Sequence, residues 1–287
     1  MRRALITVAL LLGIPSAAQQ AKIKPASSRP ADRPPISAGQ PSPYYDPQAE
    51  LQLLQLANQA RVKAGVPPLQ FDEGLVQAAR VHAQAMAEQQ QLSHQFEGEP
   101  SLPRRLSAAS PLHLDHAGEN VALNRSADGA HQSLMHSPPH RENLLDASYN
   151  IAGFGVIREG DRLYVVQDFG HSVIAYSADQ AEDTILRAVN RARAEAHLPG
   201  LARQSDAPLH DAACGMAKED RLGTRAMHDL AQRYSLVSYT NMHPETLPAG
   251  ATRFVQDRRM THVSVGACFA ESGTYPGGVY WVGLLFY

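Results

Sequence analysis

The sequence has little of several features that would each define a class of protein. Its formal net charge is only −2, and it has no clustered basic face or polybasic segment, which argues against nucleic acid and anionic lipid as partners. Beyond the N-terminal segment, no apolar run approaches the about 20 residues that span a bilayer. It has no His-Glu-x-x-His motif, which excludes the standard metalloprotease pattern. It has only two cysteines, so at most one intrachain disulfide is expected.

The N-terminus carries the features of a secretory signal peptide. Met1-Arg2-Arg3 is positively charged, Ala4 to Ile14 is apolar, and small residues follow up to Ala18. A signal peptide over residues 1–18 predicts an exported protein, periplasmic or extracellular. The alternative, a short anchoring helix, is disfavoured because the run is short and no cysteine follows for lipid attachment. Residues 19–44 are rich in proline, serine, alanine and glutamine, which predicts a flexible linker.

Periodic patterns begin after the linker. Leucines and alanines recur at helical spacing over Leu53 to Ala60, and the pattern stops near Gly65-Val66-Pro67-Pro68. A second amphipathic helix is expected over Leu75 to Ala87. Ile151 to Ile157 and Arg162 to Phe169 read as two strands joined by a turn that contains a Gly-Asp pair.

The second half of the chain repeats patterns of the first. Asn58 and Arg61 recur at one constant offset as Asn190 and Arg193, and a Pro-x-Leu match follows at the same offset. After a shift of two residues, apolar residues of the second helix find partners: Leu75 with Leu209, Ala78 with Ala212, Ala79 with Ala213, and Ala83 with Ala217. The long period indicates a duplicated domain, because solenoid repeats are about 20–50 residues long. The alternative is chance matching between helices rich in alanine and leucine.

Seven of the thirteen histidines lie between His82 and His140. Histidine suits both proton transfer near neutral pH and metal ligation, so this window is where chemistry is expected. Three motifs fall inside it. They are Leu92-Ser93-His94, Ala117-Gly118-Glu119-Asn120-Val121-Ala122, and Ser137-Pro138-Pro139-His140-Arg141-Glu142-Asn143-Leu144-Leu145.

These motifs resemble, in order and spacing, those of a bacterial CAP domain, also called an SCP domain. The family comprises cysteine-rich secretory proteins, antigen 5 and pathogenesis-related proteins. The resemblance covers residues 47 to about 171, including an Asn-x-x-Arg helix and a final Gly-x-Gly and aromatic strand. It implies an α/β fold, a three-layer α-β-α sandwich with a surface cleft, over residues 45–175. Residues 180–287 are then expected to form a second, degenerate CAP-like copy.

The resemblance also implies a set of cleft residues. Many family members line the cleft with two histidines and two acids, and some bind a divalent metal such as zinc there. His94, Glu119 and His140 match three of the four positions, with Asn120 and Arg141 beside them. The second acid has no match, because the helix before His140 reads Ser133-Leu134-Met135-His136-Ser137. Two imidazoles, one carboxylate and a water would suit tetrahedral zinc with an open position.

Each of these residues also has a structural interpretation. His82 is expected to be buried and hydrogen-bonded, and Ser137 to cap a helix or turn because it lacks a nucleophile elbow. Glu119 and Asn120 are candidates to hold the cleft loop through backbone amides. Arg141 is expected to pair with a carboxylate inside the domain, and Asn143 to cap or bridge loops. His136 and His140 are not expected to act as a helical ligand pair, because two prolines separate them.

The second half has no Gly-Glu-Asn and no His-Arg-x-Asn segment, so the duplicate is expected to have lost the cleft. Cys214 and Cys268 are expected to form a disulfide, with two free thiols as the alternative. The favoured function is an exported binding module that takes a small apolar ligand, a peptide or an envelope partner. A metal-assisted hydrolase using His94, Glu119 and His140 is the alternative. A purely structural envelope protein is a third, disfavoured because the first copy keeps its cleft residues.

Overall fold

The computed structural model describes residues 42–205 and 207–287. The predicted signal peptide and nearly all of the predicted linker lie outside these residues. The first element of the described residues is strand β1 (Tyr44–Tyr45), which includes the last residue of the predicted linker. None of the described helices is long and apolar enough to cross a membrane.

The first lobe, defined as residues 44–173, alternates helices and strands. The helices begin where the sequence supplies caps: Asp46 accepts the backbone N–H of Ala49 at the start of α1, and Asp72 accepts that of Leu75 at the start of α2. The elements after β1 are α1 (Pro47–Lys63), β2 (Gln70–Phe71), α2 (Glu73–Gln89), α3 (Leu102–Ala109), β3 (His113–Asn124), α4 (Ala127–His136), α5 (Pro138–Leu145), β4 (Ile151–Glu159) and β5 (Arg162–Val173).

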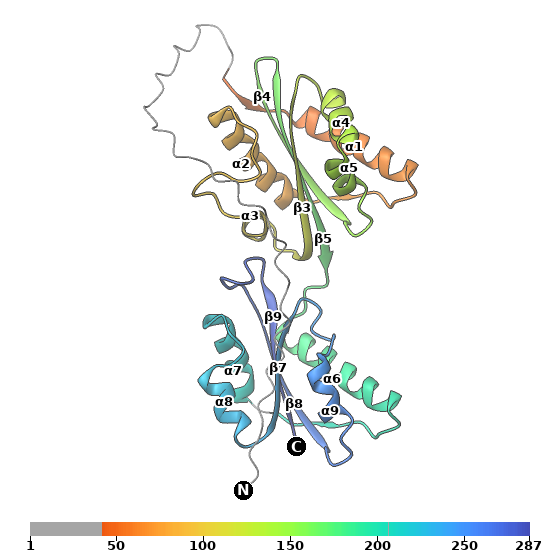
Figure 1. Ribbon diagram of the computed structural model, residues 1–287, viewed down its shortest axis with the longest axis vertical. Helices are drawn as coiled ribbons and strands as arrows, with labels where there is room; N and C mark the ends of the chain where they lie inside the picture. The colour runs from red at the N-terminus through yellow and green to blue at the C-terminus, as the bar shows by residue number, and fades with distance from the viewer. Residues whose placement is uncertain (1–41, 206) are drawn as a thin grey trace, which may run out of the picture. The chain divides into compact units, whose positions relative to one another are not determined.

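The strands form one sheet in the order β1-β4-β5-β3, and β2 pairs in parallel with β4. Helices α2 and α3 cover one face of this sheet, and α1, α4 and α5 cover the other (Figure 1). The three-layer α-β-α sandwich is therefore confirmed. The predicted hairpin is also present, with a two-residue turn at Gly160 and Asp161 between β4 and β5. Strand β3 lies at the edge of the sheet, and this places it beside the cleft residues.

The second lobe, defined as residues 176–287, has a sheet of the same design. Its strands run in the order β6-β8-β9-β7, with β6 parallel to β8 and the other pairs antiparallel, as in β2-β4-β5-β3. Helices α7 and α8 cover one face, and α6 and α9 the other (Figure 1). The elements are α6 (Ala178–Glu195), β6 (Ala202–Arg203), α7 (Ala207–Lys218), α8 (Arg225–Ala231), β7 (Ser235–Asn241), η1 (Ala249–Ala251), α9 (Thr252–Val255), β8 (His262–Ala270) and β9 (Val279–Phe286).

The two lobes also share a set of buried polar contacts. Asn58 holds both the carbonyl and the N–H of Leu69, and Asn190 does the same to Leu201. The carboxylate of Glu50 accepts the N–H of Val156 on β4, and that of Glu182 accepts the N–H of Ala267 on β8. These matched contacts support the duplication. The duplication and the two domain ranges stay predictions.

The predicted pairing of the second helices is displaced by one helical turn. Gln90 and Asp220 take the same left-handed conformation at the ends of α2 and α7, with φ of 51° and 50°. Counting back from these two residues aligns Met86 with Met216. It also aligns Leu209 with Ala79, where the sequence predicted Leu75. A four-residue slip leaves the buried face of a helix nearly unchanged, so apolar periodicity alone cannot fix the register.

The predicted disulfide is present. Cys214 on α7 and Cys268 on β8 are bonded, with their Cα atoms 5.1 Å apart. The bond ties a helix to the sheet across a separation of 54 residues. No cysteine remains free, so the alternative of two thiols is wrong for this structure.

Candidate functional site

The cleft residues are arranged around the edge strand β3. Glu119 and Asn120 are neighbours on this strand, so their side chains point to opposite faces of the sheet. Glu119 faces α2 and α3, where it meets His94 and Arg105. Asn120 faces α5, where it meets the backbone of His140. Asn120 therefore holds a backbone amide group of α5, in line with its expected role, and Glu119 bonds to the side chains of His94 and Arg105.

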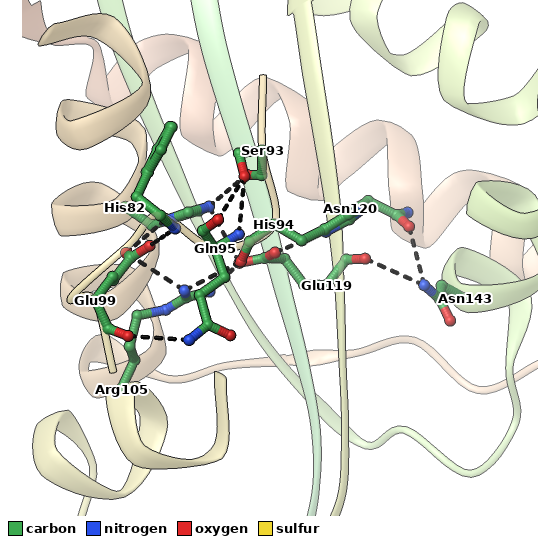
Figure 2. Close-up of polar contacts among 10 residues, drawn as sticks. His82, Ser93, His94, Gln95, Glu99, Arg105, Glu119, Asn120 and Asn143 are labelled. Atoms are coloured by element: carbon green, nitrogen blue, oxygen red, sulfur yellow. Dashed lines mark hydrogen bonds and ion pairs between the residues drawn. The ribbon is translucent and has the colours of Figure 1, made fainter. Parts of the chain in front are cut away.

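A cluster of charged side chains surrounds Glu119 on the α2 face (Figure 2). His94 Nδ1 lies 2.8 Å from Glu119 Oε1, and the guanidinium of Arg105 donates to Glu119 Oε2. Arg105 also forms an ion pair with Glu99, at 3.4 Å. Both carboxylate oxygens of Glu119 therefore have a partner, and its negative charge is balanced within the fold. This fixed geometry presents His94 at the surface.

His82 completes this cluster from helix α2. It is fully buried, with Nδ1 2.6 Å from Glu99 Oε1 and Nε2 2.8 Å from the carbonyl oxygen of Ser93. The prediction of a buried, hydrogen-bonded histidine is confirmed. Its contact with Ser93 anchors the segment that carries His94, so His82 supports the site from inside (Figure 2).

A network of amides connects β3 to helix α5 on the other face. Asn120 donates to the carbonyl oxygen of His140 at 3.0 Å and to Gln167 on β5 at 3.2 Å. Asn143 donates to the carbonyl oxygen of Glu119 at 3.2 Å and to Asn120 at 3.1 Å (Figure 2). Asn143 therefore bridges two elements, as predicted, and the network sets the position of His140 relative to the strand.

His140 lies in the first turn of α5 and is partly exposed. Its Nδ1 is 2.8 Å from the hydroxyl oxygen of Ser137. Ser137 occupies the N-cap position of α5, as expected, but its hydroxyl makes no cap hydrogen bond to the helix backbone. Helix α4 ends at His136 and α5 begins at Pro138, so His136 and His140 do not share a helix.

Arg141 does not take the predicted role. Its side chain is exposed, and no ion pair or hydrogen bond joins it to the residues that the structure describes. Successive helix positions point about 100° apart, so Arg141 turns to solvent when His140 faces the protein.

Sequence reasoning missed Asp168, which supplies a second acid. Asp168 lies on β5 directly opposite Glu119 in the antiparallel pair β3–β5 and is fully buried. Side chains directly opposite each other in such a pair share a face of the sheet. The expected second acid was sought on the helix before His140, whereas here it comes from a neighbouring strand. The one signal was that two polar residues, Gln167 and Asp168, interrupt the apolar strand between Val166 and Phe169.

The site perturbs three titrations. The hydrogen bond to Glu119 raises the pKa of His94, with partial burial opposing it. Burial lowers the pKa of His140, and the nearby charge of His94 lowers it further. Burial raises the pKa of Asp168 well above its usual range, and the negative charge of Glu119 adds to this effect. The pKa values of the two histidines are therefore shifted in opposite directions, and burial favours the neutral form of Asp168.

The arrangement does not fit a three-residue metal site. No group of three or more His, Cys, Asp or Glu in the described ranges 42–205 and 207–287 is placed to hold a metal ion. Glu119 is occupied by Arg105 and His94, and a guanidinium beside the carboxylate already supplies the positive charge that a metal would bring. The zinc site of His94, Glu119 and His140 stays a prediction without support from this geometry.

The fold and the site define a class, a three-layer sandwich whose edge strand β3 holds Glu119 against His94 and Asn120 against the backbone of His140. Residues 54–169 match the model of the CAP, or cysteine-rich secretory protein, family. Over this region the chain is similar to the CAP family and to bacterial proteins that carry the domain.

Two relatives are proteins of Bacillus subtilis. The uncharacterized membrane protein YlbC is 37% identical over 125 residues, which is 42% of this chain and 34% of that protein. The uncharacterized protein YkwD is 30% identical over 112 residues, which is 39% of this chain and 43% of that protein. The matches span well under half of each relative's length.

Among solved structures, an extracellular protein containing an SCP domain from Bacillus anthracis is 26% identical, with a TM-score of 0.41. The likeness covers 44% of this chain and 41% of that one. These comparisons concern the CAP region and leave the ligand open.

Proposed function

We propose that this chain is an exported binding protein whose CAP cleft takes a small ligand or peptide segment through His94 and His140. One observation carries the proposal: each imidazole is anchored at Nδ1, by Glu119 and Ser137 respectively, while no described residue bonds to Nε2. The side chain of His94 is 60% exposed, so its Nε2 is accessible. Two fixed rings with one open nitrogen each form a preorganised hydrogen-bonding pair.

The chemistry of the cleft favours a ligand with polar groups. A peptide presents amide and carboxylate groups that both imidazoles can bind, whereas a purely apolar ligand would leave both ring nitrogens without a partner. Among the three ligand classes predicted from the sequence, the peptide therefore has the most support. Export rests on the N-terminal sequence and on the extracellular relative, and belongs to this proposal.

The test is NMR of the histidine rings in the full mature chain. A pooled tripeptide library is titrated in, and benzene, which has no polar group, is titrated separately. Saturable changes in the His94 and His140 signals with the peptides, lost in His94→Gln and His140→Gln, would support the proposal. His136→Gln is the matched control, because His136 is exposed and bonds only to the carbonyl oxygen of Gln132. Saturation by benzene alone, or by neither probe, would contradict a peptide-binding site.

A further inference from the structure

The carboxyl group of Asp168 is buried beside another acid and has no hydrogen-bond partner among the described residues. It is fully buried, and neither of its oxygens accepts a hydrogen bond from any described N–H or O–H group. The ionisable groups facing it are Glu119 on β3, Arg105 on α3 and Glu99 in the segment before α3. Arg105 donates to Glu119 and pairs with Glu99, so its charge is already engaged. Asp168 is left beside another acid.

Two carboxyl groups side by side can be hydrogen-bonded only if one of them carries a proton. Both oxygens of Glu119 already accept a hydrogen bond, one from His94 and one from Arg105, so neither is placed to donate to Asp168. The proton therefore belongs on Asp168, whose O–H can then donate to Glu119. An ionised Asp168 here would be a buried charge to which no described group donates a hydrogen bond, which is unfavourable.

The second lobe has the same sheet, so the residues at the positions of Asp168 and Glu119 can be compared between the two lobes. Val156 on β4 and Ala267 on β8 correspond, because each donates its N–H to the matched carboxylates Glu50 and Glu182. Val156 is paired with Val165, and Ala267 with Val282.

Counting three residues along β5 and β9 from these partners places Asp168 with Leu285. The residues opposite them on the edge strands are Glu119 and Leu236. The same counting places the Asn120–Gln167 pair with Val237 and Leu284, which are also paired.

The polar pairs of the first lobe are thus apolar pairs in the second. Leu285 is fully buried and packs in the same apolar cluster as Leu236, Leu209 and Met216. The sandwich therefore forms without acids at these positions. By contrast, the contacts of Asn58, Glu50 and Arg61 recur in both lobes, as expected for residues that the fold needs.

We propose that Asp168 is a positioning residue of the cleft, whose buried carboxyl group hydrogen-bonds to Glu119 and holds its carboxylate against His94. The acid pair serves the site and not the fold. The inference rests on the proposed function in one respect, that the site served by the acid pair is a binding site. Its test needs no ligand. It deepens the description of the cleft by restoring a second acid, from β5.

Two substitutions separate the site from the fold. Asp168→Asn keeps the size and the donor, because its amide N–H can replace the acid O–H. Asp168→Leu introduces the residue of the second lobe and has no donor. The readout is the pair of His94 ring ¹⁵N shifts, which report which nitrogen carries the proton, together with thermal unfolding followed by circular dichroism. Tyr164→Phe is the control, because Tyr164 is a buried β5 residue whose hydroxyl also lacks a partner.

We expect Asp168→Asn and Tyr164→Phe to keep the wild-type His94 shifts. Asp168→Leu should fold, and its His94 shifts should move towards those of Glu119→Gln. Wild-type shifts in a folded Asp168→Leu would overturn the positioning role. Failure of Asp168→Leu to fold would overturn the claim that the acid serves the site alone, and altered shifts in Asp168→Asn would show that the hydrogen bond is not what matters. Failure to detect peptide binding would count against the proposed function, but it would not affect the positioning role of Asp168.

Discussion

Arg61 and Arg193 are fully buried guanidinium groups that make the same set of hydrogen bonds in the two lobes. Arg61 donates to the carbonyl oxygens of Pro67, Leu144, Asp146 and Tyr149. Arg193 donates to those of Pro199, Val255, Asp257 and Met260. Each arginine ties its first helix to the segment that precedes the β4 or β8 strand. The planar fork of five donors suits this task, and no other side chain offers it.

Arg61→Met should therefore destabilise the chain strongly. It leaves four carbonyl oxygens without their donor, and each unsatisfied buried group costs about 1–3 kcal/mol, so a loss of at least about 3 kcal/mol is expected. Urea unfolding measures it. Arg141→Met is the matched control, because Arg141 is exposed and without a partner among the described residues, and it should change stability by less than about 0.5 kcal/mol. Equal effects from the two variants would contradict the tethering role.

The Cys214–Cys268 bond should stabilise the second lobe. For a separation of 54 residues, the chain-entropy model gives about 4 kcal/mol. Reduction should therefore increase hydrogen exchange in β8 and β9 and leave β4 and β5 protected, as read by mass spectrometry with and without a reductant. A Cys214→Ser and Cys268→Ser double variant should match the reduced protein. Uniform loss of protection in both sheets would show that the bond stabilises more than the second lobe.

His94 should give a small, pH-dependent contribution to stability. Its pKa is raised in the folded state by the hydrogen bond to Glu119, so the contribution is complete below about pH 6.5 and is lost as the pH rises through the folded value. Because the side chain is 60% exposed, solvent screens the pair, and about 0.2–1 kcal/mol is expected. The unfolding free energies of wild type and His94→Gln should converge at pH 8.5 and separate at pH 5.5. The opposite slope would show that Glu119 does not hold the ring.

Zinc should bind weakly to the wild-type cleft. Arg105 and His94 occupy both oxygens of Glu119, so a metal would have to displace a buried ion pair. Isothermal titration of the full mature chain with zinc chloride, beside His94→Ala and His140→Ala, measures this. Submicromolar binding that both variants lose would establish the predicted metal site and revive the hydrolase alternative.

The sequence predicted the fold of the first lobe well, because ordered motifs carry this information, and two residues chosen from the same motifs, His94 and Glu119, are in contact in the structure. It missed Asp168, since the partner of a residue across a sheet depends on strand register. It missed Arg105 and Glu99 for a related reason: only the folded chain brings Arg105 to Glu119 and Glu99 to Arg105.

Two glycines let a helix approach the sheet closely, and this yields the last prediction. A Cβ at Gly155 would lie 2.3 Å from the backbone nitrogen of Arg80 on α2, and one at Gly266 would lie 2.6 Å from the backbone of Leu209 on α7. Gly155→Ala and Gly266→Ala must therefore push helix and sheet apart, which destabilises by about 1–3 kcal/mol or more. Gly215 on α7 has open space around its Cβ position, so Gly215→Ala should instead stabilise by about 0.5–1 kcal/mol through helix propensity. Thermal unfolding of the three variants checks the signs, and a neutral Gly155→Ala would contradict the close packing of α2 on β4.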